Sequence, residues 1–442
     1  MNNADAFVFF GATGDLAYRK IFPALQALVK RGHFDVPIIG VARSVENLDA
    51  LRARARDSLT EHGGGVDEAA FAKLASLLQY VQGDYADEQT FVKLRAALDG
   101  RRHPLFYLAI PPENFAGVAR HLAATGCNSG ARVVVEKPFG RDLQSARALN
   151  ATLHKCFPEP SIFRIDHYLG KEAVQNLIYF RFANTFLEPI WNRHHVRHVE
   201  VTMAEKIGIE GRGRFYEEVG AIRDVVQNHL LELAALLTME APHSGDHEAL
   251  RDEKLRALRA MQPLSPNDVV RGQFDGYRAE NGVARDSTVE TFAAVRLCLD
   301  SPRWLGVPFY IRAGKRLPVG ITEVRVELDR AGNYVRFRLS PDVIISIGAR
   351  TKTPGETMTG EDVELLVRHV DAGEMGPYER LIGDAMHGDP MLFVREDEVE
   401  AAWRVVQPVL GDATPVHSYA QETWGPAEAD AIAPPGGWIN PR

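Results

Sequence analysis

The start of the chain, an apolar run followed directly by a glycine turn, constrains the fold more than any other feature. Residues 6–10 predict a short buried strand, and the apolar positions from Ile21 to Val29 recur at helical spacing. Glycines between a strand and a helix let a phosphate approach the backbone, and the helix N-terminus offers free N–H groups and the positive end of its dipole. The sequence therefore predicts a dinucleotide-binding loop at Gly11, Ala12, Thr13, Gly14, Asp15 and Leu16.

This loop departs from the commonest dinucleotide fingerprint. Thr13 occupies the place of the second glycine, and Ala17 closes the motif. A plain tight turn is therefore an alternative interpretation of the same residues.

Further apolar runs alternate with helical patterns along the first part of the chain. Strands are expected at residues 36–42, 78–83, 105–110 and 132–135. This succession gives a parallel sheet with helices on both faces, so we expect a Rossmann-like, doubly wound α/β domain. Such sheets bind their ligands outside the carboxyl ends of the strands.

Two basic residues follow strands of this expected sheet. Arg43 stands where a site that prefers NAD often has an acidic residue, and arginine suits the extra phosphate of NADP. Lys137 precedes Pro138, a candidate cis proline, which holds the lysine in an extended conformation near the same edge. The sequence therefore favours NADP as cofactor, with NAD as the alternative. An ordinary surface position is the other interpretation of each residue.

The second half of the chain has a different pattern. Polar and apolar residues alternate at 197–203, 307–311, 324–328 and 335–339, which is typical of antiparallel strands with one buried face. A chain of 442 residues exceeds what one core usually holds. We therefore expect a dinucleotide-binding domain at 1–166 and an α+β domain with a large, mostly antiparallel sheet at 167–442.

Residues 164–172 combine several reactive side chains at a predicted strand end, turn and helix start. His167, Tyr168 and Lys171 can converge on an anion such as a phosphate, because residues four apart share a helix face. Asp166 and His167 are neighbours on extended backbone and point to opposite sides, so each needs another partner. A solvated basic turn with Asp166 as a cap is the alternative.

A long helix is expected at about 217–240, and His229 lies on its apolar stripe. A lone histidine on an apolar face is commonly a satisfied core residue, whereas an imidazole held there by a buried carboxylate would be a general base near neutral pH. Asp224 on this helix and Glu205 at the end of the preceding strand could hold sugar hydroxyls. Solvated surface positions explain these two residues equally well.

The composition excludes several classes of function. With 51 basic and 59 acidic residues the formal net charge is −8, so we expect no general attraction for nucleic acid or an anionic membrane. No apolar run approaches the ~20 residues that span a bilayer, and polar residues occupy the place of a secretory signal. Three widely separated cysteines fit neither a metal site nor a disulfide framework. We expect a reduced, cytoplasmic protein without a metal.

These motifs together resemble the glucose-6-phosphate dehydrogenase family. The resemblance rests on residues 11–17, 136–140, 164–172 and 223–229, of which 164–172 is similar to the family signature. It spans nearly the whole chain, because it continues through shorter stretches at 210–213, 251–254, 312–315, 378–381 and 424–426. The resemblance implies oxidation of the anomeric alcohol of D-glucose 6-phosphate to 6-phosphogluconolactone, with hydride transfer to NADP.

The resemblance also implies a role for the candidate catalytic residues. His229 matches the general base, Asp166 the carboxylate that orients its imidazole, and Lys137 the lysine that bridges sugar and cofactor. Arg43 matches the residue that meets the phosphate of NADP.

Substrate and partners follow from the same resemblance. Glu205 and Asp224 match residues that hold sugar hydroxyls, and the phosphate-binding set is matched by His167, Tyr168, Lys171 and Lys315. The resemblance implies a homodimer or homotetramer, with the dimer formed through the sheet of the second domain.

The chain departs from the family after Lys315. The family usually has a second basic residue five positions on, and Gly320 stands there in this chain. The stretch from 318 to 350 is contracted. A dehydrogenase of another aldose or aldose phosphate is therefore an alternative. A catalytically silent NADP-binding protein is a second alternative, because a fold does not imply its function.

Overall fold

The computed structural model describes residues 3–44, 46–244, 246–368 and 373–442, which form two compact units. The first unit comprises Met1–Glu172, Ser244–Arg251 and Glu374–Val399. The second comprises Ala173–His243, Asp252–Gly373 and Glu400–Arg442. The units are defined by spatial compactness alone, so the expected domains 1–166 and 167–442 stay a prediction.

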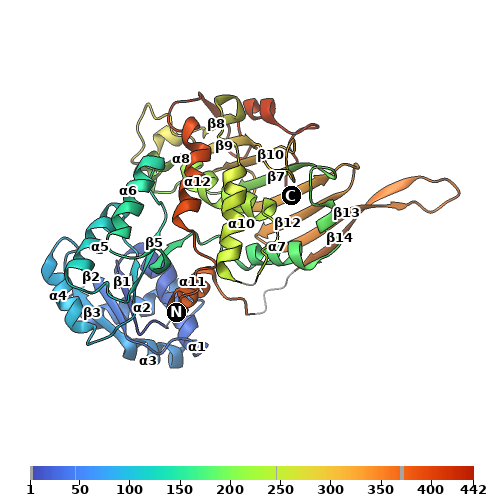
Figure 1. Ribbon diagram of the computed structural model, residues 1–442. Helices are drawn as coiled ribbons and strands as arrows, with labels where there is room; N and C mark the ends of the chain where they lie inside the picture. Colours follow the sequence, from blue (N-terminus) through green and yellow to red (C-terminus); the bar gives the residue numbers. More distant parts are fainter. Residues whose placement is uncertain (1–2, 45, 245, 369–372) are drawn as a thin grey trace. The chain divides into compact units, whose positions relative to one another are not determined.

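The first unit contains a six-stranded sheet in the order β3-β2-β1-β4-β5-β6, in which all neighbours are parallel (Figure 1). The inner strands are apolar and buried on both faces, as expected for a parallel sheet covered by helices. The predicted doubly wound α/β domain is confirmed. The strands are β1 (Ala6–Phe10), β2 (Ile38–Ala42), β3 (Leu78–Gln82), β4 (Pro104–Leu108), β5 (Arg132–Glu136) and β6 (Ile162–Ile165).

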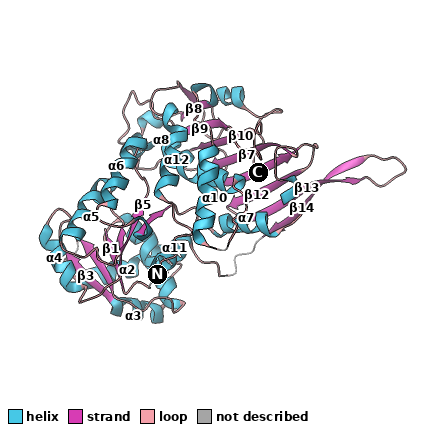
Figure 2. Cartoon of the chain, viewed as in Figure 1, coloured by secondary structure: helices cyan, strands magenta, loops and turns pink. Residues whose placement is uncertain are grey.

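Helices pack on this sheet (Figure 2). Four of them are capped by side chains that the sequence supplies. Asn47, Asp67, Asp87 and Asp142 each accept a hydrogen bond from a free N–H of the helix that follows. The helices are α1 (Phe22–Lys30), α2 (Leu48–His62), α3 (Glu68–Leu77), α4 (Glu88–Ala97), α5 (Phe115–Ala124), α6 (Leu143–His154) and α11 (Pro377–His387).

The second unit contains a nine-stranded sheet in the order β14-β13-β12-β11-β7-β10-β9-β8-β15. Only the pairs β7–β10 and β8–β15 are parallel, so the predicted large, mostly antiparallel sheet is confirmed. The strands are β7 (Val196–Ala204), β8 (Val269–Phe274), β9 (Phe292–Leu297), β10 (Phe309–Gly314), β11 (Ile321–Leu328), β12 (Tyr334–Ser340), β13 (Ile344–Lys352), β14 (Gly360–Arg368) and β15 (Val416–Tyr419).

Helices cover part of this sheet. The ring of Phe180 on α7 (Glu172–Ala183) lies 5.8 Å from that of Phe337 on β12, and a π-helical segment (Ile222–Leu230) packs against β9 and β10. Two further helices are α10 (His247–Ala260) and α12 (Glu396–Val406). Within the described residues, no helix is both long and apolar enough to cross a bilayer.

The single helix expected at 217–240 is interrupted. Helix α8 (Gly213–Ala221) contains Gly220 in a non-helical conformation, with φ 62° and ψ 176°. The π-helical segment follows, and α9 (Leu231–Thr238) ends the run. The apolar periodicity could not reveal this break, because it depends on Glu290, which lies on another part of the chain.

Candidate active site

The glycine loop after β1 is a tight turn that only glycine can make. Gly11 has φ 80°, and a Cβ there would lie 2.1 Å from the carbonyl oxygen of Ala109, which follows β4. The Gly14 N–H donates to the Gly11 carbonyl at 2.8 Å. Since β1 lies between β2 and β4, the loop occupies the point where the strand order reverses, which is the usual ligand site of such sheets.

The residues after β2 lie beside this loop. The Thr13 and Ser44 hydroxyls are 2.6 Å apart. The Arg43 guanidinium donates to Asp84 at 3.0 Å, and its side chain is 67% exposed, so it still offers N–H groups to an anion. The pKa of Asp84 is lowered by the Ala86 N–H and by Arg43.

Residues 166–171 form the predicted turn between β6 and α7. The Asp166 carboxylate accepts from the Tyr168 N–H at 2.9 Å. The Lys171 amine lies 3.7 Å from the Tyr168 ring centroid, and the His167 and Tyr168 rings are 5.6 Å apart. The structure therefore brings His167, Tyr168 and Lys171 together, with Asp166 buried at the base of the turn.

Lys137 and Asp166 follow two neighbouring strands, since Glu136 at the end of β5 pairs with Ile165 at the end of β6. Lys137 is half-buried, and the peptide between Lys137 and Pro138 is cis. Both residues thus lie at the carboxyl edge of the parallel sheet.

Two residues of this region were not among the predicted site residues. Glu136 is buried and accepts hydrogen bonds from the hydroxyls of Tyr107 and Tyr378, the first at 2.5 Å. Burial raises the pKa of Glu136 to about 7, against the effect of the Tyr107 hydrogen bond and of Lys137. The Tyr378 ring stacks on that of His167 at 6.2 Å.

The sequence offered only weak signals for this pair. Glu136 belongs to an apolar strand, and Tyr378 lies far along the chain within the short family match at 378–381. The rest of that match is structural, because Glu379 pairs with Arg31 at 2.6 Å and Arg380 pairs with Glu172.

In the second unit, three predicted residues form one charged cluster. Glu205 and Lys315 follow the parallel neighbours β7 and β10, whose last residues Ala204 and Gly314 are paired. The Lys315 amine forms a close ion pair with Glu205 and lies 3.6 Å from the Asp224 carboxylate. Lys315 is only 8% exposed, so its charge is held mainly by these carboxylates.

Tyr216 completes this cluster and was not predicted. Its ring centroid lies 5.6 Å from the Lys315 amine, and its side chain is buried. Burial raises the pKa of Tyr216 well above its usual value, and the charges of Asp224 and Glu205 raise it further. The hydroxyl therefore stays protonated at neutral pH and can donate a hydrogen bond.

His229 lies on the π-helical segment and is 3% exposed. Its backbone N–H donates to the Asn228 side chain at 2.7 Å. π-helical segments are rare in proteins, and those that occur frequently lie at functional sites. Because His229 and Asp166 belong to different units, their pairing stays a prediction.

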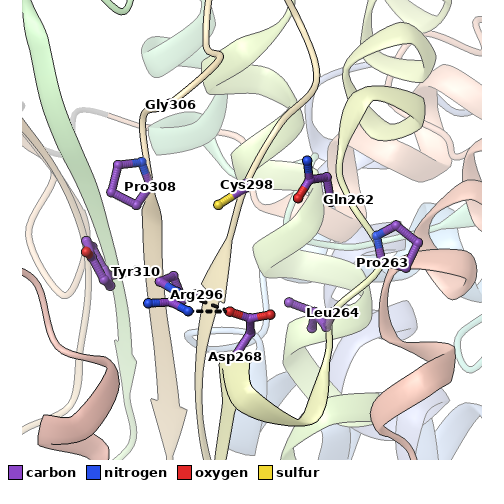
Figure 3. A pocket seen from close by; sticks show the side chains of 9 residues that line it. All are labelled: Gln262, Pro263, Leu264, Asp268, Arg296, Cys298, Gly306, Pro308 and Tyr310. Carbon is purple, nitrogen blue, oxygen red and sulfur yellow. Dashed lines mark hydrogen bonds and ion pairs between the residues drawn. The ribbon is translucent and has the colours of Figure 1, made fainter.

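A cavity elsewhere in the second unit is lined by other residues. This cavity of about 350 Å³ is lined by Cys298, Tyr310 and an Arg296–Asp268 ion pair of 2.8 Å (Figure 3).

Comparison with known proteins agrees with the geometry. A model described as "Glucose-6-phosphate dehydrogenase, NAD binding domain" matches residues 8–176, and one described as "Glucose-6-phosphate dehydrogenase, C-terminal domain" matches residues 178–438. Glucose-6-phosphate 1-dehydrogenase 1 of Mycobacterium tuberculosis is 42% identical over 97% of this chain and 94% of that protein. A relative from Arabidopsis thaliana, named as a cytoplasmic isoform, is 38% identical over 98% of this chain and 92% of that protein.

Solved structures give the same result. The crystal structure of glucose-6-phosphate 1-dehydrogenase from Mycobacterium avium matches with a TM-score of 0.93 and 42% identity, over 100% of this chain and 99% of that one. A glucose-6-phosphate dehydrogenase in complex with glucose 6-phosphate matches with a TM-score of 0.93 and 35% identity, over the whole of both chains. The chain described here belongs to the glucose-6-phosphate dehydrogenase family.

Proposed function

We propose that the protein oxidises the anomeric alcohol of D-glucose 6-phosphate to 6-phosphogluconolactone and transfers the hydride to NADP. The observation that carries this proposal is the cluster of Lys315, Glu205 and Asp224 at the end of a parallel strand pair, in a chain of this family. Two carboxylates can accept hydrogen bonds from sugar hydroxyls, and lysine can meet a phosphate.

The first unit supplies groups that fit the cofactor. Gly11 makes the tight turn after β1 that such a loop needs, since a Cβ there would meet the Ala109 carbonyl, and the exposed Arg43 suits the phosphate that distinguishes NADP from NAD. In the proposal, residues 11–16 hold the pyrophosphate and Arg43 selects NADP, with NAD as the less favoured acceptor. The nicotinamide of an NADP held by these residues would supply the hydride acceptor.

Proton removal is assigned to His229. In the proposal its imidazole takes the proton of the anomeric hydroxyl, and Asp166 orients the ring and stabilises the imidazolium that forms. Lys137, at the edge of the parallel sheet, contacts both sugar and cofactor. Burial of His229 and Asp166, which are 3% and 1% exposed, supports these roles because it keeps competing water away.

Phosphate recognition is assigned to the first turn after β6. His167, Tyr168 and Lys171 lie together there, and Lys171 is attracted to the Tyr168 ring at 3.7 Å. Lys315 adds a further positive charge in the proposal, while Glu205 and Asp224 hold sugar hydroxyls. Cytoplasmic location, which the names of plant relatives state for those proteins, is part of the same proposal.

Replacing the proposed base tests the mechanism. His229→Asn should lower kcat for glucose 6-phosphate by ~100-fold or more, because general-base catalysis typically contributes at least that much, while NADP affinity is retained. NADPH absorbance gives the rate, and fluorescence titration gives the affinity. His243→Asn serves as the control, because the His243 side chain is 71% exposed. A near-normal rate in His229→Asn would contradict the assigned role.

Introducing a basic residue at Gly320, where the family usually has one, tests the preference for a phosphorylated substrate. Gly320 directly precedes Ile321, which pairs with Ala204 next to Glu205, and a Cβ at Gly320 would meet no atom within 4 Å. Gly320→Arg should therefore fold and lower KM for glucose 6-phosphate by about tenfold, since one charged contact to phosphate is worth ~1.5–3 kcal/mol. The KM for free glucose should not change.

Gly117→Arg on α5 is the matched control for the added charge, because Gly117 also has open space around its Cβ position. Equal effects of both variants, or an unchanged KM in Gly320→Arg, would contradict the placement of the phosphate near Gly320. Glucosamine 6-phosphate and free glucose belong in the same assay. A preference of the wild type for either of them would support the alternative, a dehydrogenase of another aldose or aldose phosphate.

We also propose a homodimer formed at β14, the edge strand of the nine-stranded sheet. The hairpin of β13 and β14 projects from its neighbours (Figure 1), and Leu365, Leu366 and Val367 on β14 are 63%, 56% and 58% exposed. An exposed apolar edge strand favours pairing with another chain.

Light scattering should give twice the chain mass, or four times if two dimers associate, and Leu366→Glu should reduce it to that of one chain. Val92→Glu on α4 is the control, since Val92 is 47% exposed on a different element. A monomeric wild type, or a Leu366→Glu variant that keeps the wild-type mass, would rule out this interface.

A further inference from the structure

The segment that carries Asp224 and His229 is capped by one residue, Glu290, which lies just before β9. Glu290 accepts two hydrogen bonds from the first amides of the segment. The Ala221 N–H donates to its carbonyl oxygen at 2.9 Å, and the Ile222 N–H donates to its carboxylate at 3.0 Å. Amides at a helix start have no partner within the helix, so these contacts fix where the segment begins.

Gly220 makes this close approach possible. A Cβ at Gly220 would lie 2.5 Å from the Glu290 carboxylate, and the φ of 62° is one that other residues rarely adopt. Gly220 therefore lets the backbone change direction at the end of α8, so that the π-helical segment begins next to the Glu290 carboxylate. Gly220 and Glu290 therefore lie in direct contact at the start of the segment that carries Asp224 and His229.

The carboxylate of Glu290 is itself held in place. Its neighbour Arg271 is 2% exposed and lies 3.3 Å from it, and the same guanidinium donates to the carbonyl oxygens of Thr414 at 2.8 Å and Gly411 at 2.5 Å. Burial raises the pKa of Glu290, and Arg271 acts in the opposite direction. Glu290 is therefore paired with an arginine that two backbone carbonyls also hold.

Thr291, the residue after Glu290, anchors the backbone of Lys315. The Lys315 N–H donates to the Thr291 carbonyl at 2.9 Å, and the Tyr419 hydroxyl donates to the Lys315 carbonyl at 2.7 Å. The Thr291 and Tyr419 hydroxyls are 3.1 Å apart. Two consecutive residues, Glu290 and Thr291, therefore fix both elements from which the cluster of Asp224 and Lys315 is built.

We propose that Glu290, seated against Gly220, is a positioning residue that sets the geometry of Asp224 and His229 for the reaction. It touches neither sugar nor cofactor, and it acts through the backbone of residues 221 and 222. This inference rests on the proposed function for its kinetic readout, but its structural part does not require any substrate.

Two substitutions distinguish the effect of the hydrogen bond from the Ile222 N–H to Glu290 from the effect of the ion pair between Glu290 and Arg271. Glu290→Gln keeps an oxygen that can accept from Ile222 but loses the charge that pairs with Arg271. Glu290→Ala loses both. We expect Glu290→Ala to lower kcat by roughly 30-fold or more, since small displacements of reacting groups cost up to about 100-fold, whereas Glu290→Gln should stay within about threefold of the wild type. The KM for NADP should not change in either.

Glu323→Ala is the matched control for lost stability. Glu323 on β11 is 4% exposed and pairs with Arg338 on β12 at 2.9 Å in the sheet that also contains β9. It should lower the melting temperature without lowering kcat. A loss of kcat in Glu323→Ala as large as that in Glu290→Ala, or equal losses in Glu290→Ala and Glu290→Gln, would overturn the proposal.

Amide hydrogen exchange gives a readout that needs no substrate. Peptides covering residues 221–230 should exchange ~10-fold faster or more in Glu290→Ala, because at least one buried hydrogen bond is lost, and near the wild-type rate in Glu290→Gln. Unchanged exchange in Glu290→Ala would overturn the proposal. A wild type that exchanges as expected but does not oxidise glucose 6-phosphate would contradict the proposed function and leave the positioning role standing.

Discussion

A buried lysine held between two carboxylates is the interaction on which the candidate sugar site depends. Removing charged groups from water costs several kcal/mol per ion unless they are paired, so the positions of Lys315, Glu205 and Asp224 are interdependent. Parallel pairing of β7 and β10 brings Glu205 and Lys315 together, and the π-helical segment supplies Asp224. The carboxylates are therefore oriented before any hydroxyl group arrives, which reduces the entropy that binding must overcome.

In the first unit, too, residues of the candidate site follow the ends of neighbouring parallel strands. Its parallel strands all end at one edge, where the glycine loop, Lys137 and the turn from Asp166 to Lys171 are gathered. Glu136 is the unusual member of this edge, because it is buried beside Lys137 and receives hydrogen bonds from two tyrosines. One of them, Tyr378, stacks on His167 and so links the end of β5 to the proposed phosphate-binding turn.

The parts of this arrangement that depend on local pattern could be predicted from the sequence. Apolar runs predicted the buried parallel strands, and the glycines after the first of them predicted a turn between strand and helix. Parts that depend on distant partners could not be predicted. The break at Gly220 requires the carboxylate of Glu290, and the placement of Tyr378 requires Glu136, so neither follows from periodicity. Tyr216 was missed for the same reason, because only the fold brings its ring near Lys315.

The measurement that tests the account most directly is NADPH formation from glucose 6-phosphate, compared with free glucose and with NAD as acceptor. The account predicts rapid reduction of NADP with the phosphorylated sugar, a much lower kcat/KM with glucose, and a lower kcat/KM with NAD. Equal kcat/KM values for glucose and glucose 6-phosphate would contradict the proposed phosphate anchor of His167, Tyr168, Lys171 and Lys315. The assignment of the reaction type would then stand, and the named substrate would not.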